Sequence, residues 1–163
     1  MRLLPLAAAG LALLTLPACV SMSRSSATTA LDAEAAAGAR VSEVRLTTDD
    51  GVTVRPEFNA IFRQRVQARL DQCATGSRPL RLEASISRLD RANPVQVAII
   101  GGANVLRGQA RLVDPATGRT VADYEIGRTV VGSRLSIFQM AESEEQLSDA
   151  FGEELCDQAF KRD

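Results

Sequence analysis

The sequence predicts an α+β fold in which two helices pack on one face of a mainly antiparallel sheet, in the order β-α-β-β-β-α. Four segments alternate apolar and polar side chains, which is typical of strands with one buried and one solvated face. Two other segments place apolar residues every three or four positions, which is typical of helices with a single buried stripe. Because the apolar faces of helix and sheet need mutual cover, these elements predict a two-layer core.

The folded domain is expected to span residues 41–163 and to begin with a strand over residues 41–48, in which Ser42, Val44, Leu46 and Thr48 share one face. The turn signal Asp49-Asp50-Gly51 ends this strand. A helix follows, with Pro56 suited to its first turn. Its apolar residues form one stripe: Phe58, Phe62, Val66, Leu70 and Cys73.

Three further strands are predicted over residues 80–89, 106–112 and about 120–126. The loop Asp114–Gly118 joins the last two, because its proline presets a turn and its final glycine tolerates a positive φ. The last helix opens at Ser143, whose spacing to Gln146 is that of a capping box. Its apolar stripe runs through Leu147, Phe151, Leu155 and Ala159.

The N-terminus has the layout of a secretory signal, with Arg2 followed by an apolar run from about Leu3 to Leu16. This run is too short to span a bilayer, which needs about 20 residues. The string Leu16-Pro17-Ala18-Cys19 resembles the lipobox of bacterial lipoproteins, although proline is unusual in its middle position. The resemblance implies that residues 1–18 are removed and that Cys19 is acylated. An ordinary secretory signal with a chance cysteine is the alternative.

Residues 19–40 are rich in Ser, Ala and Thr and poor in large apolar side chains. Such a segment buries too little surface to offset its ordering entropy, so it is expected to be a flexible tether. Val20 after the lipidated Cys19 resembles the sorting signal for the outer membrane, which implies a lipid-anchored protein on its periplasmic face.

Cys73 and Cys156 remain in the exported chain and are expected to form a disulfide. Both lie near the ends of helices that are predicted to cover the same sheet face. Two buried thiols or a redox pair are the alternatives, but the cysteines lack Cys-x-x-Cys spacing.

The composition argues against several kinds of function. The chain has no His and a formal net charge of −1, so it lacks the commonest general base and metal ligand and any electrostatic case for nucleic acid. We therefore expect neither an enzyme nor a cofactor or metal site. Membrane contact through the lipid and an unidentified envelope protein are the expected partners.

Two apolar segments, residues 94–104 and 130–140, fit the two-layer scheme poorly. The first lacks the glycine spacing of a phosphate-binding loop. Large apolar side chains in a connection are typical of a surface that contacts a partner or, for the first segment, lipid, while burial inside the domain is the alternative. The residues assigned to partner binding are Ile99, Ile100, Leu135, Ile137, Phe138 and Met140.

The solvated sheet face is expected to carry both signs of charge. Cross-strand pairs are the simpler interpretation of this pattern, and an anionic ligand is the alternative. The residues concerned are Arg81, Arg107, Arg111, Glu83, Asp123 and Glu125.

The element order, the Asp-x-x-Thr-Gly hairpin at Asp114–Gly118 and the lipobox together resemble small bacterial envelope lipoproteins, including auxiliary lipoproteins of envelope transport systems. The resemblance covers roughly residues 41–160. It implies an accessory protein of an envelope assembly or transport complex that acts by protein binding. A membrane-tethered ligand-binding or inhibitor module is the alternative.

Overall fold

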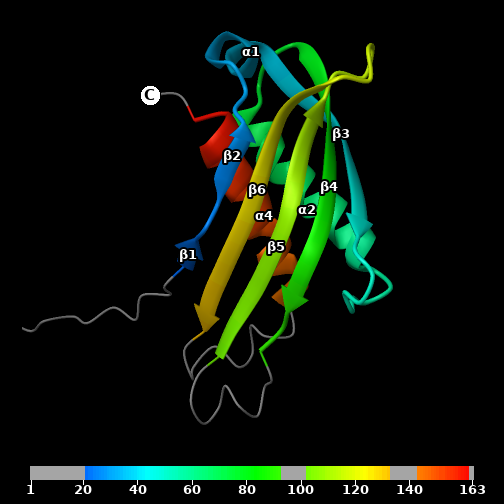
Figure 1. The fold of residues 1–163 in the computed structure, drawn as a ribbon, viewed down its shortest axis with the longest axis vertical. Helices are drawn as coiled ribbons and strands as arrows, with labels where there is room; N and C mark the ends of the chain where they lie inside the picture. The colour runs from blue at the N-terminus through cyan, green and yellow to red at the C-terminus, as the bar shows by residue number, and fades with distance from the viewer. Residues whose placement is uncertain (1–20, 93–101, 133–142, 162–163) are drawn as a thin grey trace, which may run out of the picture.

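The computed structural model describes residues 21–92, 102–132 and 143–161. Its six-stranded sheet has the order β1-β6-β5-β4-β3, with β2 also paired to β6. The strands are β1 (Ser21–Ser23), β2 (Ser26–Thr29), β3 (Ala39–Thr48), β4 (Arg78–Asp90), β5 (Gly102–Val113) and β6 (Thr120–Gly132). The long helices α2 (Phe58–Cys73) and α4 (Ser143–Ala159) cover one face of the sheet (Figure 1). The predicted fold class is confirmed.

The sheet is antiparallel except between β3 and β4, which run parallel. Parallel neighbours need a crossover connection, and α2 provides it between these two strands. The β5–β6 hairpin turns where predicted. Its Gly118 has a φ of +71°, and the Asp114 carboxylate accepts a hydrogen bond of 2.9 Å from the Ala116 N–H.

The helices pack closely on each other as well as on the sheet. The Phe62 ring of α2 lies 5.1 Å from the Phe151 ring of α4, in an edge-to-face arrangement. Gly152 allows the close approach, because a Cβ there would lie 2.8 Å from the Cβ of Arg69. Cys73 and Cys156 form a disulfide with a Cα–Cα distance of 5.8 Å, so the ends of α2 and α4 are joined covalently.

The inward residues of the central strands make up the sheet side of the core, as their alternation predicts. These residues are Leu80, Leu82, Ala84, Ile86, Leu106, Ala110, Leu112, Ala122, Tyr124 and Ile126. The alternation predicted for β3 is wrong at one point. A register shift between Val41 and Glu43 leaves Ser42 exposed and lets both Val41 and Val44 face the core.

The N-terminal segment differs from the expected flexible tether. Residues 21–29 form β1 and β2, which pair antiparallel with β6, and a short helix α1 (Ala33–Gly38) follows. In Figure 1 these strands lie along the edge of the sheet beside β6, and α1 lies at one end. The expectation failed because it considered apolar burial alone. The edge of β6 offers backbone hydrogen bonds that this polar segment satisfies.

Candidate functional site at one end of the sheet

One end of the sheet gathers the features that the sequence assigns to function. Ser21, the first residue of β1, pairs with Val130, and Gly102 pairs with Gly132 at the end of β6. Cys19, the predicted lipidation site, precedes Ser21 by two positions and lies outside the described residues. We call this end, where β1 and β5 begin and β4 and β6 stop, the anchor end.

Both apolar segments are attached to the anchor end. Residues 91–101 join β4 to β5, and residues 133–142 join β6 to α4; of these, 93–101 and 133–142 lie outside the described residues. Since Gly102 and Gly132 are register partners, the two segments meet the sheet on neighbouring strands at the same level. The residues predicted to bind a partner all lie outside the described residues: Ile99, Ile100, Leu135, Ile137, Phe138 and Met140.

A buried carboxylate pairs with arginines next to the points where the two apolar segments leave the described structure. Glu144, at the start of α4, has a fully buried side chain. Its Oε2 lies 2.7 Å from Nε of Arg55, and its Oε1 lies 3.0 Å from Nη1 of Arg91. Arg91 follows β4, so this cluster links the beginning of one apolar segment to the end of the other. Hydrogen bonds to Glu144 and then to Glu145 raise the pKa of Arg55.

A second ion pair fixes the segment that leads from Cys19. Glu154 of α4 accepts a hydrogen bond of 2.6 Å from Ser23 Oγ and pairs with Nη1 of Arg128 at 2.8 Å. Only 4% of the Glu154 side chain is exposed. Burial alone would raise the pKa of its carboxyl, but hydrogen bonds from Ser23, Gln158 and Ser25 and the charge of Arg128 outweigh burial and lower it. The carboxylate form therefore holds β1 against β6 and α4.

Backbone contacts continue this docking along β6. The Arg24 N–H donates to the Gly127 carbonyl at 2.8 Å, and the Gly127 N–H donates to Ser25 Oγ at 3.1 Å. A Cβ on Gly127 would lie 2.7 Å from the Arg24 carbonyl oxygen, so the glycine makes room for the crossing chain. The N-terminal segment is thus an integral part of the sheet.

These polar contacts were not found by sequence reasoning. Arg55 and Glu144 are separated by 89 positions and Ser23 and Glu154 by 131, so no local spacing signals either pair. The helix predicted to open at Ser143 includes Glu144 in its first turn, and nothing in that pattern indicates a buried ion pair. The one available signal was the pair of acidic residues next to an apolar segment.

The solvated sheet face carries the expected mixture of charges. Asp123 of β6 accepts a cross-strand hydrogen bond of 3.2 Å from Gln109 of β5, but the arginines contact residues on their own strands. Arg81 pairs with Glu83 at 2.9 Å along the same strand, and Arg111 donates to Gln109, also along its own strand. In the sheet register, Arg111 of β5 lies opposite Glu83 of β4 on one side and Asp123 of β6 on the other. A rotamer that reaches a residue two positions away on the same face competes with cross-strand pairing.

Within residues 21–92, 102–132 and 143–161, no helix combines the length and hydropathy needed to cross a bilayer. In these same ranges, no three side chains of His, Cys, Asp or Glu gather where they could hold a metal ion.

No protein-family model and no curated protein matches the sequence. Among solved structures, the PelC dodecamer from Paraburkholderia phytofirmans is similar, with a TM-score of 0.55 and 13% identity over 88% of this chain and 100% of that one. Protein XCC0632 from Xanthomonas campestris, of the family DUF330, has a TM-score of 0.52 and 13% identity over 72% of this chain and 81% of that one. The chain shares the fold of these proteins.

Proposed function

We propose that the protein is a lipid-anchored accessory protein of the bacterial envelope, held on the periplasmic face of the outer membrane through Cys19. We further propose that it acts by binding a protein partner through the anchor end. One observation carries this proposal: β1 begins at the end of the sheet to which both apolar segments are attached. Two residues reach at most about 7 Å, so acyl chains on Cys19 would lie close to these segments.

The docked N-terminal segment would fix the orientation of the domain relative to the membrane. A flexible tether of some twenty residues would let the domain turn freely above the membrane. With β1 paired to β6 and held by Glu154, the domain would instead stand with its anchor end at the bilayer. The parts of these segments outside the sheet, residues 94–101 and 133–140, would then meet a partner in or on the same membrane, because residues 102–104 and 130–132 belong to β5 and β6.

The resemblance to auxiliary lipoproteins of envelope transport systems supports an accessory role. The similar fold of PelC, whose solved structure is a dodecamer, makes self-association worth measuring on the lipidated chain. A membrane-tethered ligand-binding module is the second candidate function. A cavity at the opposite end of the sheet favours it.

The test replaces Ile137 and Phe138 by Ser in the chain that keeps Cys19. If these residues bind a partner, the free energy of unfolding in urea changes by less than about 1 kcal/mol, as is usual for surface substitutions. Affinity capture from the protein's own membranes should then recover an envelope protein with the wild type and with the control Ile61→Ser, but not with the double variant. A loss of about 2–5 kcal/mol per residue would place the side chains in the core and contradict the proposal.

The anchor is tested separately by Cys19→Ser. The variant should lose acylation and no longer float with membranes. Unchanged mobility and unchanged membrane retention would contradict the lipid anchor while leaving the partner-binding test intact.

A further inference from the structure

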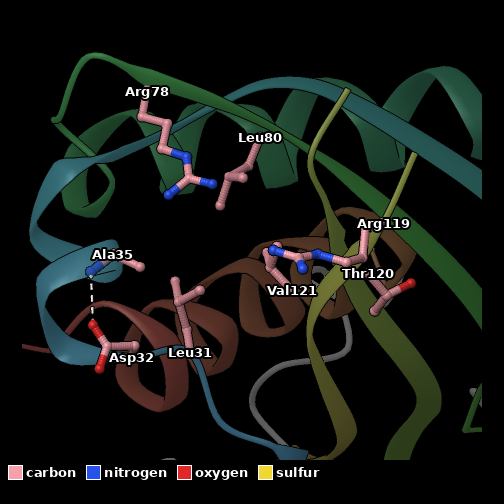
Figure 2. A pocket seen from close by; sticks show the side chains of 8 residues that line it. All are labelled: Leu31, Asp32, Ala35, Arg78, Leu80, Arg119, Thr120 and Val121. Atoms are coloured by element: carbon pink, nitrogen blue, oxygen red, sulfur yellow. Dashed lines mark hydrogen bonds between the residues drawn. The ribbon is translucent and has the colours of Figure 1, made fainter. Parts of the chain in front are cut away.

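A cavity of about 380 Å³ lies at the end of the sheet opposite the anchor end. We call this end of the sheet the hairpin end, because the turn between β5 and β6 lies there. Its volume falls within the range of small-molecule sites. It lies between the N-terminal segment and the first residues of β4 and β6 (Figure 2). The lining residues are Leu31, Asp32, Ala35, Arg78, Leu80, Arg119, Thr120 and Val121.

Apolar side chains form part of the wall. Leu80 is buried, and Leu31 and Val121 are half-buried. Leu31 is held in place by its backbone N–H, which donates to the hydroxyl of the fully buried Tyr124 at 2.7 Å. The Asp32 carboxylate is engaged at the start of α1, where it accepts hydrogen bonds from the Glu34 and Ala35 N–H groups, so it is not turned toward the arginines (Figure 2).

Two guanidinium groups extend into the cavity from different strands. Figure 2 shows Arg78 entering from the side of β4 and Arg119 from the side of β6. Arg78 has a long contact of 3.3 Å to Asp114 and remains half exposed. Among the described residues, no carboxylate oxygen lies within 4.0 Å of the Arg119 guanidinium. The cavity therefore combines apolar walls with an excess of positive charge.

We propose that this cavity binds a small anionic amphiphile. A carboxylate or phosphate head group would lie between Arg78 and Arg119, whose planar guanidinium groups match such oxygens in geometry. A hydrocarbon part would cover Leu31, Leu80 and Val121. A bare anion would leave these apolar side chains in contact with water, and a neutral lipid would leave Arg119 without a partner. The proposal does not rest on the anchor or on the protein partner.

The N-terminal segment supplies one side of the site. Leu31, Asp32 and Ala35 lie between β2 and β3, in the segment that sequence reasoning assigned to a tether. The cavity exists only because β2 and α1 are docked at this end. This explains why no sequence motif signalled it.

The test measures binding of octanoate and octyl phosphate to the full chain in phosphatidylcholine vesicles by equilibrium dialysis, with empty vesicles as the blank. Inorganic phosphate and octanol are the two control ligands. We expect saturable binding of at least one octyl anion, about tenfold tighter than either control ligand. The preferred head group distinguishes a fatty acid from a phosphate monoester. Because Tyr124 is the sole tyrosine and the chain has no Trp, its fluorescence reports whether the ligand is beside Leu31.

Two variants test whether the ligand binds in the cavity. Arg119→Gln removes the guanidinium that has no carboxylate neighbour among the described residues, and Ala35→Leu fills the cavity. Each should weaken binding by about tenfold. The matched control Arg63→Gln removes an exposed arginine of α2 and should leave affinity unchanged. Equal affinity for octanol, equal affinity for inorganic phosphate, no saturable binding, or unchanged affinity in both cavity variants would each overturn the proposal. Failure here leaves the capture test at the anchor end unaffected.

Discussion

The two ends of the sheet use arginine differently. At the anchor end, Arg55 and Arg91 share the fully buried carboxylate of Glu144. At the hairpin end, Arg78 has one long contact to Asp114, and Arg119 has no carboxylate neighbour among the described residues. Paired arginines fix the chain, because charge and hydrogen bonds are already satisfied. An arginine that has no carboxylate neighbour in the described part of the chain and lies beside an apolar cavity is available to an anionic ligand.

The N-terminal segment connects these two ends. It begins at the anchor end with Ser21. The hydroxyl of Ser23 then donates a hydrogen bond to the Glu154 carboxylate. At the hairpin end, the Leu31 N–H donates to the hydroxyl of Tyr124. The same docking would orient the domain at the membrane and build one side of the cavity. Substitutions at one end should leave the contacts at the other end in place.

The largest effect is expected from the disulfide near the hairpin end. Cys73 and Cys156 are 83 positions apart, and opening a loop of this length costs about 4–5 kcal/mol by the chain-entropy model. Urea unfolding of the Cys73→Ala, Cys156→Ala variant should show this loss, and the wild type under reducing conditions should match the variant. A loss below about 1 kcal/mol would contradict a main stabilising role for the disulfide, because the remaining contacts between α2 and α4 would then suffice.

The ion pair that docks β1 is expected to matter less. Arg128→Met leaves the buried carboxylate of Glu154 without its cation, which costs about 3 kcal/mol. The matched control Arg65→Met removes a half-exposed partner of Asp149 and should cost less than about 1 kcal/mol. Both losses are read from urea unfolding. Equal losses would contradict the special role assigned to the Arg128 pair.

The pH dependence of stability gives the smallest expected effect. The pKa of Glu154 is lower in the folded chain than its ordinary value of 4.5. Between the folded and the unfolded pKa, the unfolded chain therefore binds more protons than the folded chain. Its contribution to stability is present above about pH 4.5 and is lost as the pH falls through the folded pKa. Glu154→Gln should flatten the stability curve in this acid range only. Stability is measured from about pH 3 to about pH 7. Parallel curves of unfolding free energy against pH for the variant and the wild type would contradict the assignment.

Local patterns predicted most of the fold because burial has a period in the sequence. The stripe ending at Cys73 defines α2, and the alternation from Leu80 defines β4. The same reasoning failed for residues 21–29, since short edge strands are stabilised by backbone pairing with β6 rather than by apolar side chains. It also missed the buried Glu144 cluster and the cavity, because both depend on side chains brought together from distant parts of the chain.

The orientation that we propose, with the anchor end at the membrane, can be measured directly. Asp90 and Thr117 are exposed residues at the anchor and hairpin ends, separated by about the 40 Å length of a 13-residue strand. A cysteine introduced at either position can be labelled alone, because Cys73 and Cys156 are joined in a disulfide and Cys19 would be acylated. In vesicles containing a lipid-bound energy acceptor, the account predicts strong quenching of a fluorophore at position 90 and weak quenching at position 117. Equal quenching at both positions, or stronger quenching at position 117, would contradict it.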